Sequence, residues 1–217
     1  MTKIFTHMRT HALSFAALLL TLFAFTATPA MGQMGGMNGM DIKPGVRAGV
    51  DFMTFGGDDA DGDDLGRRTG IMIGGFALVD LTGPFALQPE LTYIQKGAES
   101  SDGDLTRKND YIEIPVLAKF QLPVSGPASP NLFAGPTLGF NVTAELEDDE
   151  GNTQDFGDET SGTEFGLAVG GGVDFGLGTG TLMVDLRYEL GLTSIDDTDA
   201  DQSIRNQGFV ITAGFVF

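Results

Sequence analysis

Hydrophobic and polar residues alternate at every second position in seven stretches of the chain between residues 45 and 217. Successive side chains of a β-strand point to opposite faces, so this alternation predicts strands with one apolar and one polar face. The stretches are 45–55, 85–97, 110–122, 131–146, 164–175, 182–190 and 208–217. Residues 70–81 are apolar on both faces and predict an eighth strand, whose register the pattern leaves open.

The residues on the polar face decide whether the apolar face points inward or outward. Alternation alone also fits a water-soluble barrel with an apolar interior. Here, however, the second face combines many glycines and threonines with the charged residues Arg47, Asp51, Glu90, Glu113, Lys119, Asp174, Asp185, Arg187 and Glu189. Small and charged groups in a narrow lumen, with large aliphatic groups facing lipid, are typical of transmembrane barrels. The pattern therefore predicts an all-β fold, an eight-stranded antiparallel up-and-down transmembrane β-barrel.

The connections between the predicted strands alternate in length and charge. Three short ones carry no charged residue, namely 82–84, 123–130 and 176–180. Four long ones hold nineteen of the 30 acidic residues, namely 56–68, 97–109, 146–163 and 193–206. Eight antiparallel strands with both termini on the periplasmic side would produce this order, with the acidic loops facing outward.

Aromatic residues fall at two heights under this threading. Phe85, Phe120, Phe175 and Phe217 lie next to the short turns, and Phe52, Tyr93, Phe140, Phe165 and Phe209 lie near the long loops. Two aromatic belts are expected at the two membrane interfaces. Aromatic residues are also common at strand ends of soluble sheets, so this pattern alone leaves that alternative open.

The carboxy-terminal strand ends on an aromatic residue. Phe217 is preceded at every second position by Phe215, Ala213, Ile211 and Phe209. Such an ending resembles the sorting signal that the outer-membrane assembly machinery reads on a final barrel strand. We therefore expect this machinery and outer-membrane lipid as partners, and the bacterial outer membrane as the location.

The first residues differ from the rest of the chain. Lys3 and Arg9 precede a mostly apolar run, 13–27, and small residues follow it. This order predicts a secretory signal peptide over residues 1–32, cleaved after Ala30 or Gly32. A retained anchor is the alternative, but the run is shorter than the about 20 residues that a spanning helix needs. Residues 33–44 are expected to form a flexible Gly/Met-rich lead-in to the barrel domain, 45–217.

Residue usage excludes several classes of chemistry. The chain has no cysteine, and its two histidines, His7 and His11, lie in the predicted leader. The mature protein would therefore lack Ser-His-Asp and Cys-His catalysis and the usual zinc ligands. Loss of Lys3 and Arg9 with the leader changes the formal net charge from −18 to −20. Nucleic acid is not expected as a partner of so acidic a protein.

Six segments together resemble the PorT-like outer-membrane β-barrel proteins of Bacteroidetes and their relatives. They are GVRAGVDF, FALQPELTYIQKGA, DYIEIPVLAKF, NLFAGPTLGFNV, RYELGLTSI and NQGFVITAGFVF. The resemblance covers about residues 43–217, and LQPELTYIQKG and YIEIPVLAKF are its most telling parts. It implies an eight-stranded barrel and supplies no catalytic motif. Some members of that family are linked to protein secretion and gliding.

The acidic loops raise the question of a metal site. Asp58, Asp59, Asp61, Asp63 and Asp64 are spaced somewhat like a calcium loop, but Gly70 stands where an EF-hand has its twelfth-position Glu. A second acidic set is Glu147, Asp148, Asp149, Glu150, Asp196, Asp197, Asp199 and Asp201. We expect solvated loops that bind cations weakly through dispersed charge, with no defined metal site and no cofactor.

Carboxylates in the lumen could serve acid-base catalysis or pair with cations. Glu90, Glu113 and Glu189 are matched in number by Arg47, Lys119 and Arg187, which favours a buried network. An eight-stranded barrel is just wide enough to be filled by its side chains, so no diffusion pore is expected. The expected function is non-enzymatic, structural or mediated by the loops. The alternatives are an accessory of a secretion or transport complex and, third, an enzyme without histidine.

Overall fold

The computed structural model describes residues 41–57, 65–124, 126–155, 157, 160–196 and 204–217. These residues belong to one compact unit, Met40–Phe217. Its strands are β1 (Ile42–Gly56), β2 (Leu65–Asp80), β3 (Phe85–Ser100), β4 (Leu105–Gln121), β5 (Ala128–Asp148), β6 (Thr153–Asp155), β7 (Thr163–Gly176), β8 (Thr181–Gly191) and β9 (Arg205–Val216). The described part of the chain contains no helix long and apolar enough to cross a membrane.

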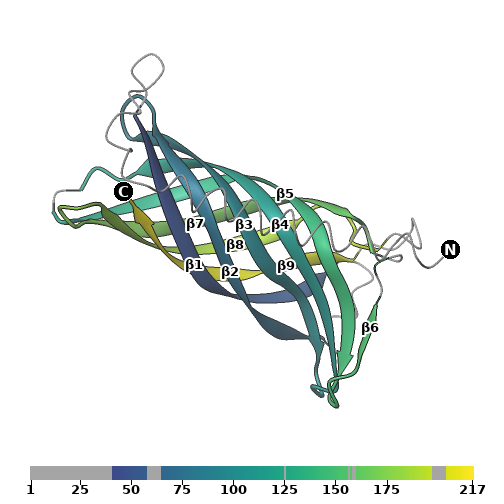
Figure 1. Cartoon of the computed structure of the whole chain (residues 1–217). Coiled ribbons are helices and arrows are strands. Elements are labelled where there is room, and N and C mark those ends of the chain that lie inside the picture. The colour runs from purple at the N-terminus through teal and green to yellow at the C-terminus, as the bar shows by residue number, and fades with distance from the viewer. Residues whose placement is uncertain (1–40, 58–64, 125, 156, 158–159, 197–203) are drawn as a thin grey trace. The chain divides into compact units, whose positions relative to one another are not determined.

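Eight of these strands close into a barrel (Figure 1). Each pairs antiparallel with the next in the order β1, β2, β3, β4, β5, β7, β8 and β9, and β9 returns to β1. Closure leaves no sheet edge within the barrel wall, so the ladder satisfies backbone groups that lipid cannot. The predicted fold is confirmed.

The side chains of the wall alternate as the sequence predicts. On β8, Val184 is 43% exposed and Asp185 beside it is 2% exposed. The structure also settles the register of β2, which the sequence leaves open. Ile71 is 53% exposed and faces outward, whereas Met72 is 1% exposed and faces the lumen. The pairing of Val50 with Ile71 and of Gly49 with Met72 fixes this register.

The strands are longer than the alternation predicts, and the loops are correspondingly shorter. The expected loop 97–109 is a four-residue turn, because β3 runs to Ser100 and β4 begins at Leu105. The expected loop 146–163 contains the additional strand β6, which pairs with the end of β5. β1 starts at Ile42, which lies inside the expected lead-in 33–44. Ile42 pairs with Val79 on β2. Polar residues occupy both faces of these extensions, so hydrophobic alternation gives no signal there.

We call the barrel end with the short turns the turn end and the opposite one the loop end. The turn end holds 81–84, 122–127 and 177–180, together with the start of β1 and the end of β9. Near the loop end both β3 and β4 depart from alternation, because three consecutive residues are buried in each, 96–98 and 109–111. Gly97 has a φ of 132°, and a Cβ there would collide with the backbone oxygen of Arg107. This irregularity therefore requires glycine.

Aromatic side chains form contacts on the outer face at both heights. At the turn end the ring centroids of Phe85 and Phe120 are 5.2 Å apart. Nearer the loop end the Phe209 ring lies 5.0 Å from that of Tyr188, and Phe52 is its partner across the strands β1 and β9. The outward orientation predicted for Phe52, Phe85, Phe120 and Phe209 is confirmed. Tyr188 is an additional member of the aromatic row nearer the loop end.

We predict that Val184→Arg lowers the free energy of unfolding in lipid vesicles by about 2 to 4 kcal/mol, because the new charge would face the bilayer interior. Val124→Arg is the matched control. Val124 is exposed in a connection at the turn end, so its replacement should change stability by less than about 0.5 kcal/mol. Urea titrations of both variants provide the measurement, and equal effects would contradict the outward assignment of Val184.

Deletion of Phe217 should reduce insertion into the outer membrane. The Phe217 ring lies 5.5 Å from that of Phe215, and its amide donates to the backbone oxygen of Pro44 at 3.0 Å. The measurement is the amount of heat-modifiable, folded protein in isolated outer membranes. Phe209→Ala removes another outward aromatic side chain of β9 and should insert normally. If the truncated protein reaches wild-type levels, the assembly machinery does not require the terminal aromatic residue.

Candidate functional site

The lumen contains many charged side chains. All nine charged residues that the sequence assigns to the polar face are buried, with exposures between 0% and 6%. Four further buried charged residues face them or lie in the wall, namely Arg68, Lys96, Asp110 and Glu164. The site is therefore built from thirteen charged groups on the six strands β1, β2, β3, β4, β7 and β8.

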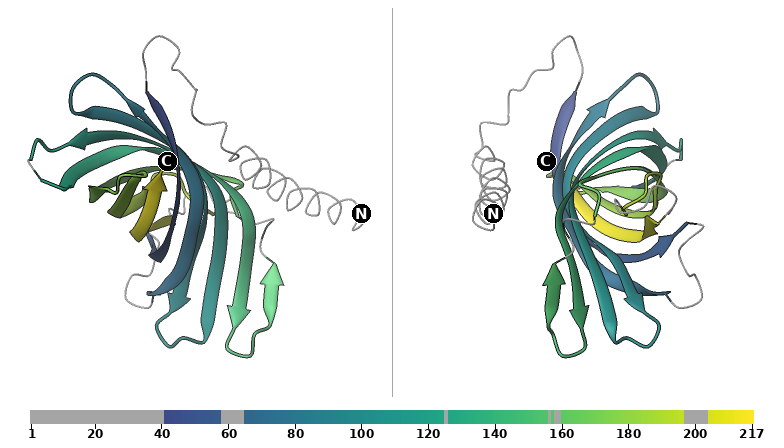
Figure 2. Two further views of the ribbon diagram at one scale, coloured as in Figure 1. Left: turned by 60° about the vertical axis from the view of Figure 1, so that its left-hand side comes forward. Right: turned by 90° about the vertical axis from the view of Figure 1, so that its right-hand side faces the viewer.

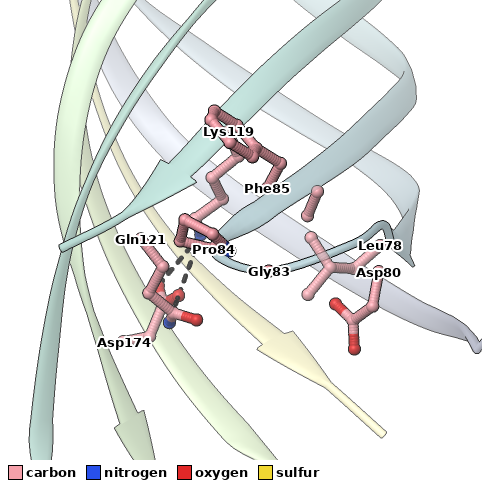
Figure 3. A pocket seen from close by; sticks show the side chains of 9 residues that line it. Leu78, Asp80, Gly83, Pro84, Phe85, Lys119, Gln121 and Asp174 are labelled. Atoms are coloured by element: carbon pink, nitrogen blue, oxygen red, sulfur yellow. Dashed lines mark hydrogen bonds and ion pairs between the residues drawn. The ribbon is translucent and has the colours of Figure 1, made fainter. Parts of the chain in front are cut away.

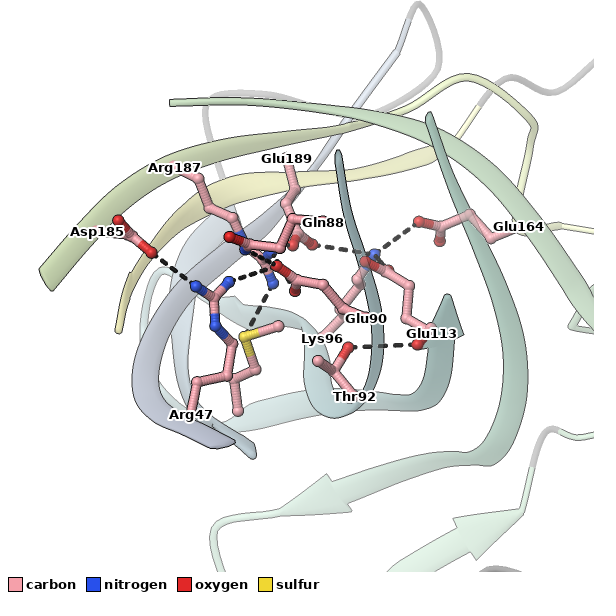
Figure 4. Close-up of polar contacts among 11 residues, drawn as sticks. Arg47, Gln88, Glu90, Thr92, Lys96, Glu113, Glu164, Asp185, Arg187 and Glu189 are labelled. Atoms are coloured by element: carbon pink, nitrogen blue, oxygen red, sulfur yellow. Dashed lines mark hydrogen bonds and ion pairs between the residues drawn. The ribbon is translucent and has the colours of Figure 1, made fainter. Parts of the chain in front are cut away.

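The centre of the lumen is held by two arginines around one glutamate (Figure 4). Arg47 on β1 and Arg187 on β8 approach the two carboxylate oxygens of Glu90 on β3 at 2.6 and 3.1 Å. Arg47 also binds Asp185 at 2.6 Å, and Gln88 donates to Glu90 at 2.7 Å. Buried charges are tolerated when they are paired and hydrogen-bonded in this way. Glu90 thus belongs to a buried network of paired charges, which the sequence favours.

Lys119 lies in a separate ion pair toward the turn end. It pairs with Asp174 on β7 at 3.0 Å, while Asn131 donates to the same aspartate at 3.0 Å. Glu113 binds Lys96 at 2.6 Å. Lys119 and Asp174 line a cleft of about 200 Å³ at the turn end, together with Phe85 (Figure 3). The number of charges on each strand cannot reveal such pairings, because it does not show which strands the closed barrel brings together.

Lys96 is the residue that the sequence analysis missed. Its ammonium group approaches Glu113 at 2.6 Å, Glu164 at 3.0 Å and Glu189 at 3.3 Å, so it joins β3 to β4, β7 and β8. It also lies 5.4 Å from the centroid of the Tyr111 ring. Lys96 continues the inward series of Gln88, Glu90 and Thr92. Extension of that series to the end of the predicted strand would have identified it.

Arg68 is a second buried cation, and it contacts the irregular segments of β3 and β4 near the loop end. Arg68 on β2 binds Asp110 on β4 at 3.0 Å and donates to the backbone oxygen of Lys96. Its side chain passes beside Gly97, where a Cβ would lie 3.4 Å from Arg68 Cδ. The hydroxyl of Tyr93, from the outer face, donates to the same aspartate at 2.6 Å. These contacts join β2, β3 and β4 at the height of the aromatic row.

Apolar clusters lie on both sides of the charged network. At the loop end Phe55, Ala98 and Ile195 pack together, with the partly buried Ile204 against them. At the turn end Phe76, Met183 and Val216 form a second cluster, and the Arg47 guanidinium lies 4.9 Å from the Phe76 ring centroid. The ion pairs are therefore enclosed by packed side chains, as expected for a barrel of this size.

The acidic loops form no metal-ligand set within the described residues. The calcium-like residues Asp58, Asp59, Asp61, Asp63 and Asp64 and the residues Asp197, Asp199 and Asp201 lie outside the described part. In the β5–β6 hairpin, hydrogen bonds from Asn152 hold the pKa of Asp148 below its usual range. Glu147 pairs with Lys108 on the neighbouring strand. These acids are thus engaged in local contacts.

A closed antiparallel barrel with an aliphatic outer face and a charged lumen defines an outer-membrane β-barrel. Residues 31–197 match the model of the outer membrane protein beta-barrel domain, so the chain belongs to this family. It is accordingly a protein of the bacterial outer membrane. The chain has no match among the curated proteins.

Several solved structures share the fold. Neisserial surface protein A (NspA) aligns with a TM-score of 0.51 and 16% identity, over 80% of this chain and 97% of that one. A major outer membrane protein from Thermus thermophilus gives 0.49 and 13%, over 81% and 99% of the two chains. Ail of Yersinia pestis, in complex with the heparin analogue sucrose octasulfate, gives 0.43 and 14%, over 82% and 99%. At such identities the likeness to NspA shows the fold alone.

We predict that Lys96→Met lowers the free energy of unfolding by about 3 to 5 kcal/mol, because three buried carboxylates would lose their shared counter-charge. Lys108→Met is the matched control, because Lys108 pairs with a single glutamate at a partly exposed position. Its replacement should cost less than about 1 kcal/mol. Urea unfolding in lipid vesicles measures both. A loss for Lys96→Met no larger than for Lys108→Met would contradict its central role.

Proposed function

We propose that this protein is a non-enzymatic outer-membrane barrel that presents part of its wall outside the membrane as a contact surface. The observation that carries the proposal is the unequal length of the strands. β3, β4 and β5 contain 16, 17 and 21 residues, whereas β8 has 11. Tilted strands need only about 9 to 11 residues to cross the hydrocarbon region. The ends of β3, β4 and β5 extend together with β6 at one end of the barrel (Figure 2), and this extra length would lie beyond the membrane.

The projecting surface consists of the β3–β4 turn, the β5–β6 hairpin and the strand ends that carry them. It is strongly acidic, with the residues Glu99, Asp102, Asp104, Glu145, Glu147, Asp148, Asp149, Glu150 and Asp155. Within the described residues of this surface, Lys108 pairs with Glu147, and Arg107 lies 5.5 Å from the Phe55 ring centroid. A positively charged partner suits this surface, since complementary charge accelerates encounter and sets specificity.

The filled lumen supports a role without catalysis or solute passage. Groups such as Glu90 and Glu113, which could transfer protons, are enclosed by ion pairs and by apolar clusters at both ends. General acid-base chemistry needs a substrate within hydrogen-bond reach of the catalytic group. The two enclosed glutamates offer a substrate no such position, so the role falls to the outer surfaces.

A role as an accessory of a secretion or transport complex is the second candidate, and membership of the PorT-like branch would favour it. The segments LQPELTYIQKG and YIEIPVLAKF, which carry that resemblance, form β3 and β4 and supply Glu90, Lys96, Glu113 and Lys119. Deletion of the gene should separate the two roles. Loss of exported proteins from the medium would favour the accessory role, and their unchanged export would favour the surface role.

The orientation can be tested by labelling with cysteine, because the chain has none of its own. We expect Ser101→Cys, in the β3–β4 turn, to react with a membrane-impermeant thiol reagent on intact cells. Thr179→Cys, in the β7–β8 turn, should react only after the outer membrane is opened. Both residues are exposed, so accessibility in the folded barrel is matched. Labelling of Thr179→Cys alone on intact cells would reverse the proposed orientation.

The same cysteine positions test the proposed surface. A cleavable cross-linker attached at Ser101→Cys should capture one defined partner from intact cells. Replacement of Asp102 and Asp104 by Asn in that background should abolish the adduct, because it removes charge from the turn. The adduct should persist when Asp41 and Asp80, acids at the turn end, are replaced. An adduct that is insensitive to all four acids would argue against recognition by charge.

A further inference from the structure

Charge is distributed unevenly along the lumen. The turn-side group combines Arg47, Lys119 and Arg187 with Glu90, Asp174 and Asp185, and its charges balance. The loop-side group combines Arg68 and Lys96 with Asp51, Asp110, Glu113, Glu164 and Glu189, and Glu189 also pairs with Arg187 of the turn-side group at 3.0 Å. Among the described buried residues, the loop-side group thus holds three more acids than bases. A buried charge without a partner costs several kcal/mol or more, so such an excess calls for compensation.

Asp51 is the one acid of the loop-side group that no ion pair or hydrogen bond engages. It is 0% exposed, and neither carboxylate oxygen has a hydrogen-bond partner. Its cross-strand neighbours are Gly70 on β2 and Val210 on β9, whose side chains offer no donor. Two acids that interact with it through space, Glu189 on β8 and Asp110 on β4, add charge of the same sign.

The two cations that interact with Asp51 have other partners. Arg68 on β2 binds Asp110 and the backbone oxygen of Lys96, and Lys96 on β3 is shared by three glutamates. Asn109, which pairs with Lys96 across β3 and β4, is also 0% exposed and has neither amide atom hydrogen-bonded. Asp51 and Asn109 are therefore two side chains of 0% exposure without hydrogen bonds.

Oxygen atoms converge beside Asp51. A Cβ on Gly70 would lie 2.6 Å from Asp51 Oδ1 and closer still to the backbone oxygen of Gln95. The missing side chain of Gly70 therefore lets a carboxylate oxygen and a carbonyl oxygen approach the same region. Oxygen atoms of these two kinds are the ligands that hard cations prefer. Since the described residues contain no metal-ligand set of three acids, a tightly held divalent ion is not expected.

We propose that the loop-side group binds one small monovalent cation, an alkali ion or a proton, and that Asp51 holds it. The cation is taken up when the barrel folds, because the unfolded chain has no such enclosed group. It offsets part of the excess negative charge and supplies Asp51 with the partner that the protein does not provide. The site is independent of the proposed contact surface.

Urea unfolding of the full-length mature barrel in lipid vesicles tests the alkali-ion form. We compare sodium chloride with tetramethylammonium chloride at equal ionic strength and pH, so that screening of the loop acids is the same. A ligand that binds only the folded state raises the folding equilibrium constant in proportion to its concentration, by up to about tenfold for a tenfold rise in sodium. Asp51→Asn should lose this dependence. Asp174→Asn, which alters a paired acid of the turn-side group, should keep it.

A second series of urea unfolding measurements, at constant sodium concentration and varied pH, tests whether the bound cation is a proton. A proton bound only in the folded state would raise the folding constant by up to about tenfold for each pH unit of acidification, and Asp51→Asn would abolish this increase. Asp51→Asn should also be at least as stable as the wild type at low sodium and high pH, whereas loss of a purely structural aspartate would lower stability.

The proposal is overturned if the wild type responds neither to sodium nor to pH, or if Asp51→Asn responds as the wild type does. If Asp51→Asn does not fold, measurements on the wild type alone test the proposal. Retention of radioactive sodium by the purified barrel, or net proton uptake on folding measured with a pH electrode, should then be about one per chain under the proposal. Absence of both would reject it.

Discussion

A chain that crosses lipid as strands must pair every backbone polar group with another strand, and this requirement governs the rest of the structure. Closure through β1 and β9 meets it, but closure of eight strands also leaves an interior too narrow for bulk water. Side chains on the inner face therefore need partners from other strands of the barrel. Arg47 on β1 and Arg187 on β8 meet at Glu90 on β3 for this reason.

The narrow lumen explains where the barrel needs glycine. Gly49 on β1 and Gly170 on β7 face residues of adjacent strands so closely that a Cβ at either site would collide with a neighbouring backbone oxygen, of Ile211 and Leu186 respectively. Gly172 on β7 leaves room for a charged side chain, because a Cβ there would collide with Asp185 Oδ1. Glycine on the inner face and paired charges in the lumen are thus two parts of one packing solution.

The sequence predicts the barrel well because alternation reports one strong physical difference, that between lipid and lumen. It predicts which face Asp185 and Val184 take, and the structure confirms both. The prediction of strand ends fails where side chains no longer divide into lipid-facing and lumen-facing sets. The extensions of β3, β4 and β5 are polar on both faces, so their pairing is set by backbone hydrogen bonds, which leave no pattern of hydrophobicity. Composition likewise shows how many cations are present, but only the closed geometry shows that Lys96 serves three glutamates.

The charged network and the projecting sheet share their strands, and this links the interior to the outer surface. Lys96 lies four residues before the end of β3, and Asp110 lies five residues after the start of β4. Their contacts, with Arg68 from β2, fix the base from which the β3–β4 turn extends. The polar ends of β3, β4 and β5, which we propose to project from the membrane, have little apolar surface to bury and so gain little stability of their own. Their geometry therefore depends on the ion pairs inside the barrel, and in this way the lumen contributes to the outer surface.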